Sequence, residues 1–127
     1  MNILAIDDNT ELLAAVADML VRHAHTVDCA DSADKALELV RAKHYDVVLV
    51  DYWMPVHNGM WFIKNASLPR NTKVLLVTSY VDMEVVKKMF DEGIAGYVAK
   101  PFDETELLLH LKFHESNHIE KQISPGR

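Results

Sequence analysis

The chain has 127 residues, of which 50% are hydrophobic and 25% charged, and this length and composition suit a single globular domain with a real hydrophobic core. Its net charge of -6 argues against a bare nucleic-acid-binding protein and gives no support for binding to an anionic membrane. Because the sequence contains neither an apolar run of about 20 residues nor a basic signal-peptide segment, we expect a cytoplasmic protein.

Short apolar segments predict five strands, at residues 2–6, 26–30, 46–50, 73–78 and 95–99. The third and fourth contain the runs VVLV and VLLV, which are typical of strands buried on both faces of a sheet. Cys29 lies in the second segment and is the only cysteine, so an internal disulfide is excluded. Its strand-like neighbours predict a buried, unreactive thiol.

Amphipathic segments between and after the strands predict five helices, at residues 11–22, 32–43, 60–66, 82–92 and 103–116. Ser32 is the expected N-cap of the second helix. Residues 119–127 are polar and include Pro125 and Gly126, so we expect a tail or a linker stub there. Strands that alternate with helices pair in parallel through right-handed crossovers, which predicts a three-layer α/β/α sandwich.

Polar side chains follow four of the predicted strands. They are Asp7 and Asp8, Asp51, Thr78 and Ser79, and Lys100. Ligands of an open parallel sheet bind beyond the carboxyl ends of its strands, so these groups are expected to meet at one edge. An acid at a strand end can also simply cap the next helix, but three acids together need a cation. Because neither Cys nor His joins them, Mg²⁺ suits the site better than Zn²⁺.

Five separated motifs resemble the response-regulator receiver domain of two-component signal transduction. They are DD at residues 7–8, DYWMP at 51–55, Gly59, VTS at 77–79 and KPF at 100–102. The resemblance covers roughly residues 2–115, and it places a CheY-like receiver domain at residues 1–118. It implies a flavodoxin-like (βα)5 fold with a five-stranded parallel sheet in the order 2-1-3-4-5.

The resemblance also implies a metal site. Asp8, Asp51 and the backbone carbonyl of Trp53 would bind Mg²⁺ directly, and Asp7 would hold it mainly through water. Asp51 would be the phosphoacceptor, whose carboxylate attacks a phosphoryl group to form an aspartyl phosphate. Lys100 would pair with Asp51 and later with a phosphoryl oxygen.

The remaining implied roles concern switching. The Thr78 hydroxyl would bind a phosphoryl oxygen, and Tyr97 occupies the position of the switch aromatic, although an ordinary half-buried tyrosine fits equally well. The Lys100–Pro101 peptide would be cis. Trp53 and Tyr80 flank the expected path of hydrolytic water, so we expect slow self-dephosphorylation, unless these rings merely shield apolar surface.

The expected function is therefore a phosphorylation-dependent switch that is not an enzyme, apart from its own phosphorylation and dephosphorylation at Asp51. Its partners would be a histidine kinase or a phosphotransfer protein, with no direct contact to nucleic acid or membrane. The face formed by the fourth helix, fifth strand and fifth helix could bind an output partner or a second copy. Leu109 and Phe113 would be either edge packing or a partner patch.

Three other readings stay open. The chain could be the receiver portion of a longer regulator with a DNA-binding or enzymatic output. A Mg²⁺-dependent phosphohydrolase using Asp51 is disfavoured because Trp53 replaces the second aspartate that haloacid-dehalogenase-like enzymes carry there. A degenerate binding module is disfavoured by the complete set of acids, hydroxyl and lysine.

Histidines give weaker signals. Three recur with a four-residue spacing in the last predicted helix: His110, His114 and His118. Without neighbouring acids they predict a solvated helix face rather than a metal site. His57 lies in the loop after Asp51; it is expected to be a plain loop residue, with contact to the phosphoryl site as the alternative.

Overall fold

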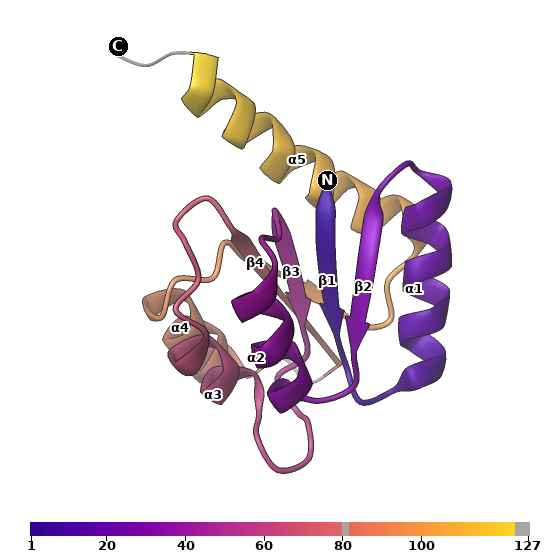
Figure 1. Cartoon of the computed structure of the whole chain (residues 1–127). Helices are drawn as coiled ribbons and strands as arrows, with labels where there is room; N and C mark the ends of the chain where they lie inside the picture. Colours follow the sequence, from indigo (N-terminus) through magenta and orange to yellow (C-terminus); the bar gives the residue numbers. More distant parts are fainter. Residues whose placement is uncertain (80–81, 124–127) are drawn as a thin grey trace.

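A computed structural model describes residues 1–79 and 82–123, with side chains through residue 115. Five parallel strands form one sheet in the order β2-β1-β3-β4-β5. The strands are β1 (Asn2–Ile6), β2 (Thr26–Ala30), β3 (Val47–Val50), β4 (Lys73–Thr78) and β5 (Gly96–Ala99). The helices are α1 (Thr10–Arg22), α2 (Ala33–Ala42), α3 (Gly59–Ala66), α4 (Met83–Asp91) and α5 (Glu104–Ile123). The predicted flavodoxin-like α/β/α fold and its strand order are confirmed (Figure 1).

Side chains that point alternately to the two faces of the sheet divide the core into two layers. Leu4, Val48 and Leu76 face the layer formed with α2, α3 and α4. Ile3 and Leu49, one residue away along their strands, face the layer formed with α1 and α5. Because successive strand side chains point to opposite faces, a strand covered on both sides must be apolar at every position, as β3 is.

Side-chain caps fix where helices begin, and thereby the shape of the loops that precede them. The Oδ1 atom of Asn9 accepts a hydrogen bond from the Leu12 amide at the start of α1 (3.1 Å). Ser32 caps α2 as the sequence predicts, and Asn58 caps α3. Each cap satisfies a backbone N–H that the first helical turn leaves without a partner. The other predicted bounds differ from the observed ones by a residue or so, except in α5.

Helix α5 continues to Ile123, beyond the predicted end at residue 116. The expected tail at residues 119–127 is therefore helical through Ile123, and residues 124–127 lie outside the described part of the chain. The reason is local: no glycine or proline interrupts the sequence between Asp103 and Ile123. A domain boundary near residue 118 stays a prediction. Among the described helices, none combines the length and apolar character that crossing a membrane requires.

Two expectations about individual side chains are wrong. Cys29 is exposed rather than buried, because β2 is an edge strand whose side chains are only partly covered. His114 is only 7% exposed instead of lying on a solvated face. It packs over Gly96, which has no side chain: a Cβ atom built on Gly96 would lie 3.5 Å from the His114 Nε2 atom. The side chain of His118 lies outside the described residues.

Candidate functional site

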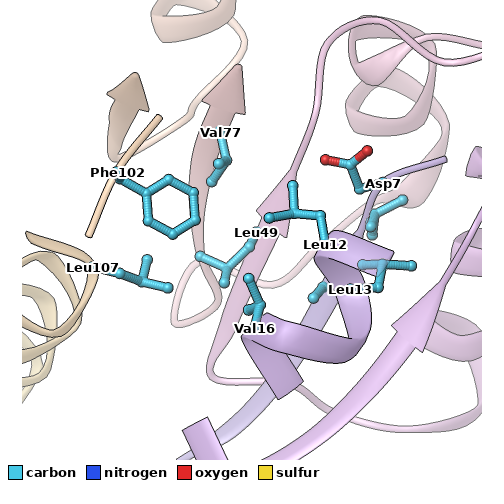
Figure 2. Close-up of a pocket in the computed structure, with 10 residues that line it drawn as sticks. Asp7, Leu12, Leu13, Val16, Leu49, Val77, Phe102 and Leu107 are labelled. Carbon is cyan, nitrogen blue, oxygen red and sulfur yellow. The ribbon is translucent and has the colours of Figure 1, made fainter. Parts of the chain in front are cut away.

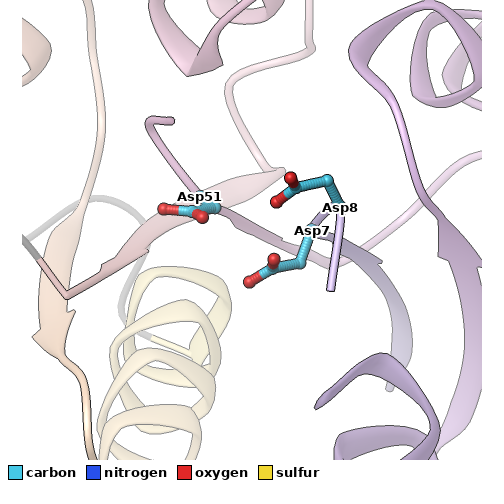
Figure 3. Close-up of side chains that lie close together, drawn as sticks. All are labelled: Asp7, Asp8 and Asp51. Carbon is cyan, nitrogen blue, oxygen red and sulfur yellow. The ribbon is translucent and has the colours of Figure 1, made fainter. Parts of the chain in front are cut away.

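The register of β1 and β3 brings the first two strand-end acids together. Ile6 pairs with Val50, so Asp7 and Asp51 leave neighbouring strands side by side. The Asp51 amide donates to the Ile6 carbonyl (3.1 Å), which continues the pairing by one step. Carboxylate oxygens of Asp7, Asp8 and Asp51 all lie within 4.8 Å of one another, and Figure 3 shows the three carboxyl groups gathered at this edge of the sheet.

Lys100 supplies a positive charge to this cluster. Its Nζ atom lies 2.6 Å from Asp7 Oδ2 and 3.4 Å from Asp51 Oδ2. The expected pairing with Asp51 is present, although the shorter contact is to Asp7. The Lys100 amide donates to the Thr78 carbonyl (2.8 Å), and the following Lys100–Pro101 peptide is cis, as the resemblance implies.

Burial and the positive charge of Lys100 have opposite effects on the pKa of Asp51. Asp7 and Asp51 are only 5% and 7% exposed, whereas Asp8 faces solvent. Burial raises the pKa of Asp51, Lys100 opposes the shift, and the negative charge of Asp7 adds to it. Two like charges about 4 Å apart repel by roughly 4 kcal/mol at an effective dielectric constant near 20. The cluster therefore favours a bound cation.

The donor set fits Mg²⁺. Carboxylate oxygens are hard ligands of the kind that Mg²⁺ prefers, and the described cluster includes no Cys or His. Asp8 is exposed, so water can reach the open side of the cluster and complete the coordination. The Trp53 backbone N–H donates a hydrogen bond to Asp51, which keeps the loop after β3 close to the acids.

A small cavity of about 20 Å³ lies beneath Asp7, between α1 and the sheet. Apart from Asp7, the labelled side chains that line it in Figure 2 are apolar: Leu12, Leu13, Val16, Leu49, Val77, Phe102 and Leu107. A site of this kind offers little to hold a water molecule. Compensation for the charge of Asp7 must therefore come from Lys100 and the rim above it.

The loop between β3 and α3 returns tightly onto Asp51. The Gly59 amide donates to the Tyr52 carbonyl (2.8 Å), and a Cβ atom at Gly59 would lie 2.7 Å from the Asp51 carbonyl oxygen, so only glycine fits. Val56 has φ +71°, and the His57 amide closes a three-residue turn on the Pro55 carbonyl (2.9 Å). A β-branched residue at such a φ is an outlier, with strain of order 1–3 kcal/mol.

The two predicted switch residues, Thr78 and Tyr97, lie on the face of the sheet that α2, α3 and α4 cover. Thr78 is the last residue of β4 and only 1% exposed. Leu76, two residues earlier and therefore on the same face, pairs with Tyr97 of β5. Tyr97 is partly buried against the core layer of α2, α3 and α4. Thr78 and Tyr97 thus border the same layer.

Trp53 and Tyr80 are the two residues expected to affect dephosphorylation. Trp53 is 54% exposed, and its ring makes an edge contact with Tyr52 (4.9 Å between centroids). Tyr80 lies outside the described residues. Trp53 is therefore open to solvent over about half of its surface.

An open groove of about 640 Å³ extends from Lys100 along α1. Its lining combines apolar side chains of α1, such as Leu12 and Met19, with Phe102 and the charged Arg22 and Glu104. The groove therefore joins the acidic cluster to a mixed apolar and charged surface.

Sequence reasoning missed a contact made by His57. Its Nδ1 atom lies 3.2 Å from a carboxylate oxygen of Asp34 in α2, and its ring stacks on Trp61 of α3 (3.7 Å between centroids). His57 lies before the start of α3, so its four-residue separation from Trp61 is not a helical spacing that predicts the contact. Nothing in the sequence points to Asp34, which comes from a different helix.

Comparison with known proteins decides the family. Residues 3–112 match the family model described as "Response regulator receiver domain". The chain belongs to this family. Receiver domains of this family are signalling modules of two-component systems.

The relatives of this receiver domain include larger proteins. It is 30% identical to the signal transduction histidine-protein kinase BarA of Shigella flexneri over 97% of this chain and 14% of the kinase. It is 33% identical to the regulatory protein AtoC of Escherichia coli over 84% of this chain and 23% of AtoC. The chain thus spans less than a quarter of either relative's length. Receiver domains occur both in histidine kinases and in regulators that carry further domains.

Solved structures agree with the observed fold. The chemotaxis protein CheY4 of Vibrio cholerae aligns with a TM-score of 0.84 at 28% identity, covering 88% of this chain and 96% of CheY4. A CheY-like receiver domain protein of Methanospirillum hungatei aligns with a TM-score of 0.90 at 24% identity, covering 94% and 97% of the two chains.

Proposed function

We propose that this receiver domain accepts a phosphoryl group on Asp51 and acts as a Mg²⁺-dependent signalling switch. The observation that carries the proposal is the grouping of Asp7, Asp8 and Asp51 within 4.8 Å, with Lys100 in contact with two of them. Asp8, Asp51 and the Trp53 carbonyl would hold the ion directly, and Asp7 would hold it through water. Bound Mg²⁺ would neutralise charge on the transferring phosphoryl group.

The transfer itself needs few groups from the chain. A carboxylate oxygen of Asp51 forms the new bond to phosphorus, while the bond from phosphorus to the donor breaks and the donor keeps its electron pair. Lys100 moves from Asp7 and Asp51 towards a phosphoryl oxygen, and the Thr78 hydroxyl donates to another. Positioning and charge neutralisation of this kind account for most of the catalysis in phosphoryl transfer.

The phosphoryl group would then bias the surface of α4, β5 and α5. It adds about -1.5 to -2 charges close to Thr78. Movement of Thr78 towards it frees space on the face that Tyr97 borders, so Tyr97 can turn inward. That face would bind an output partner or a second copy, and Leu109 and Phe113 of α5, both 60% exposed, are available for such contact.

The test of phosphorylation is a mass measurement after incubation with acetyl phosphate, with and without Mg²⁺. One labile phosphoryl group is expected only with Mg²⁺, and Asp51→Asn should abolish it. Asp18→Asn is the matched control, because Asp18 is an exposed carboxylate of α1 away from the cluster. Unchanged labelling of Asp51→Asn would refute the proposal, and steady turnover of phosphate esters would instead favour a phosphohydrolase.

We further propose that a histidine kinase or a phosphotransfer protein delivers the phosphoryl group by docking in the groove along α1. Ala15 is exposed and lines this groove, whereas its exposed neighbour Ala14 lines a different surface beside Cys29. Ala15→Arg should slow transfer from a phosphodonor protein at least tenfold without affecting acetyl phosphate, and Ala14→Arg should affect neither. Equal effects of the two variants would argue against this docking site.

The indole of Trp53 would slow self-dephosphorylation by obstructing the in-line approach of water to phosphorylated Asp51. Trp53→Asn is expected to shorten the half-life of the phosphoryl group several-fold, and combination with Tyr80→Glu should shorten it further. The half-life is measured as loss of the phosphoryl mass with time after donor removal. An unchanged half-life in the double variant would show that these rings only cover apolar surface.

A further inference from the structure

We propose that His57 is a positioning residue that links the β3–α3 loop to α2 and thereby strengthens Mg²⁺ binding. This inference rests on the proposed metal-dependent function. It concerns a side chain that contacts Asp34 and Trp61 and that would act on the acidic cluster through the loop carrying Trp53.

The contacts of His57 lie outside its own loop. Its Nδ1 atom is 3.2 Å and 3.3 Å from the two carboxylate oxygens of Asp34, so the ring bridges to the first turn of α2. Its ring lies almost parallel to that of Trp61, at 9° between the planes and 3.7 Å between centroids. A single side chain therefore fixes the end of the loop to two helices.

The loop needs such a contact. At its base the Gly59 amide binds the Tyr52 carbonyl, but Val56 next to His57 has φ +71°, a conformation that valine disfavours. Val56 is also 89% exposed, so its side chain packs on little that could hold this turn. Release of His57 would let the turn relax, and the relaxation would reach Trp53, whose carbonyl is the expected metal ligand.

The ring of His57 meets one charged and one neutral side chain. Among the described residues in contact with it, Asp34 is charged and Trp61 is neutral. The single lysine of each of these two helices is paired elsewhere: Lys35 of α2 with Asp31, and Lys64 of α3 with Glu92. Asp34 therefore pairs with His57 rather than with a lysine of either helix.

Calorimetric titration with Mg²⁺ tests the proposal on the intact chain. Relative to the unmodified protein, His57→Gln and Asp34→Asn should each weaken binding about threefold. The double variant should bind like either single variant, because both substitutions remove the same link.

Two controls separate this link from general effects. His44→Gln removes another histidine contact, to Asn71 (3.1 Å), that is not part of the loop, and it should leave Mg²⁺ affinity unchanged. Asp8→Asn should abolish binding. In metal-free protein, amide exchange of Gly59 and Trp61 should be about tenfold faster in His57→Gln, because the loop opens more often.

The outcomes are distinct. Unchanged Mg²⁺ affinity in His57→Gln, with binding still abolished by Asp8→Asn, overturns the role of His57 and leaves the proposed function standing. A chain that binds no Mg²⁺ at all overturns both. Additive losses of affinity in the double variant also overturn the proposal, since the two side chains would then act independently rather than through one link.

Discussion

At the scale of single residues, Asp51 combines burial with a neighbouring like charge. Both raise its pKa, and Lys100 together with the Trp53 backbone N–H opposes them. The residue that would react is thus one that destabilises the metal-free fold. Functional sites commonly retain such groups because the ligand relieves the unfavourable charge.

Replacement of Asp51 should therefore stabilise the metal-free protein. Asp51→Asn removes the buried charge, so its urea midpoint should rise, and added Mg²⁺ should no longer raise it further. Because the folded pKa of Asp51 is raised, its unfavourable contribution grows as the pH rises above about 4. The increase in stability caused by Asp51→Asn should therefore also grow as the pH rises. Asp8→Asn, at an exposed position, should have a smaller effect; an equal effect would contradict this account.

Val56 offers a second prediction at this scale. Val56→Gly relieves the strain at φ +71°, and this relief should outweigh the greater freedom of glycine in the unfolded chain. We expect a gain of up to about 1 kcal/mol in the free energy of unfolding. Val21→Gly, at an exposed position in α1, should instead lose about 0.3–0.5 kcal/mol. Urea unfolding of both variants should show opposite signs.

At the scale of elements, the junctions between strands and helices place the acids. Asn9 caps the start of α1 directly after the two acids that follow β1. Asn58 caps the start of α3 after the loop from β3. Gly59 lets α3 start against the backbone of Asp51. The position of Asp51 is therefore set partly by the helix that follows it.

Two glycines test this dependence. Gly59→Ala places a methyl group against the Asp51 carbonyl oxygen, so it should destabilise the protein by about 1–3 kcal/mol and weaken Mg²⁺ binding. Gly96→Ala adds a methyl group at ordinary contact distance, 3.5 Å from its nearest neighbours, and should be tolerated. Urea unfolding and Mg²⁺ titration check both variants. Similar behaviour of the two would show that the backbone contact at Gly59 is unimportant.

At the scale of the whole molecule, tertiary packing leaves two histidines poorly solvated. His114 of α5 is buried, and His25 lies beside the N-terminal ammonium group. Burial lowers the pKa of His114, with the charges of His110 and Lys73 acting in the same direction. Burial and the N-terminal ammonium lower the pKa of His25. In both cases the unfolded chain binds more protons than the folded one just below pH 6.5.

The fold should accordingly lose stability as the pH falls below about 6.5. His114→Gln removes one titrating group and should make the free energy of unfolding less dependent on pH between 7 and 5. His44→Gln, at an exposed site, should leave that dependence unchanged. Urea unfolding at several pH values measures both, and parallel curves for His114→Gln and the unmodified protein would contradict the assignment.

The sequence by itself predicted the strands, the fold class and the candidate acids, because these depend on local patterns. An uninterrupted apolar run indicates a buried parallel strand, and the residue after it lies at the sheet edge. That rule identifies Asp7, Asp51 and Lys100 without coordinates. It fails for Cys29, because an apolar pattern does not say that β2 is an edge strand, and for His114, because its burial depends on the missing side chain of Gly96.

Only the tertiary structure decided which side chains touch. The sequence indicates that Lys100 belongs with the acids, but not that it lies nearer Asp7 than Asp51, since that depends on how two separate strands are placed. The contact of His57 with Asp34 joins a loop to a helix that precedes it by a whole strand. Hydrophobic periodicity determines the secondary structure, whereas contacts between distant polar groups depend on packing that no local pattern contains.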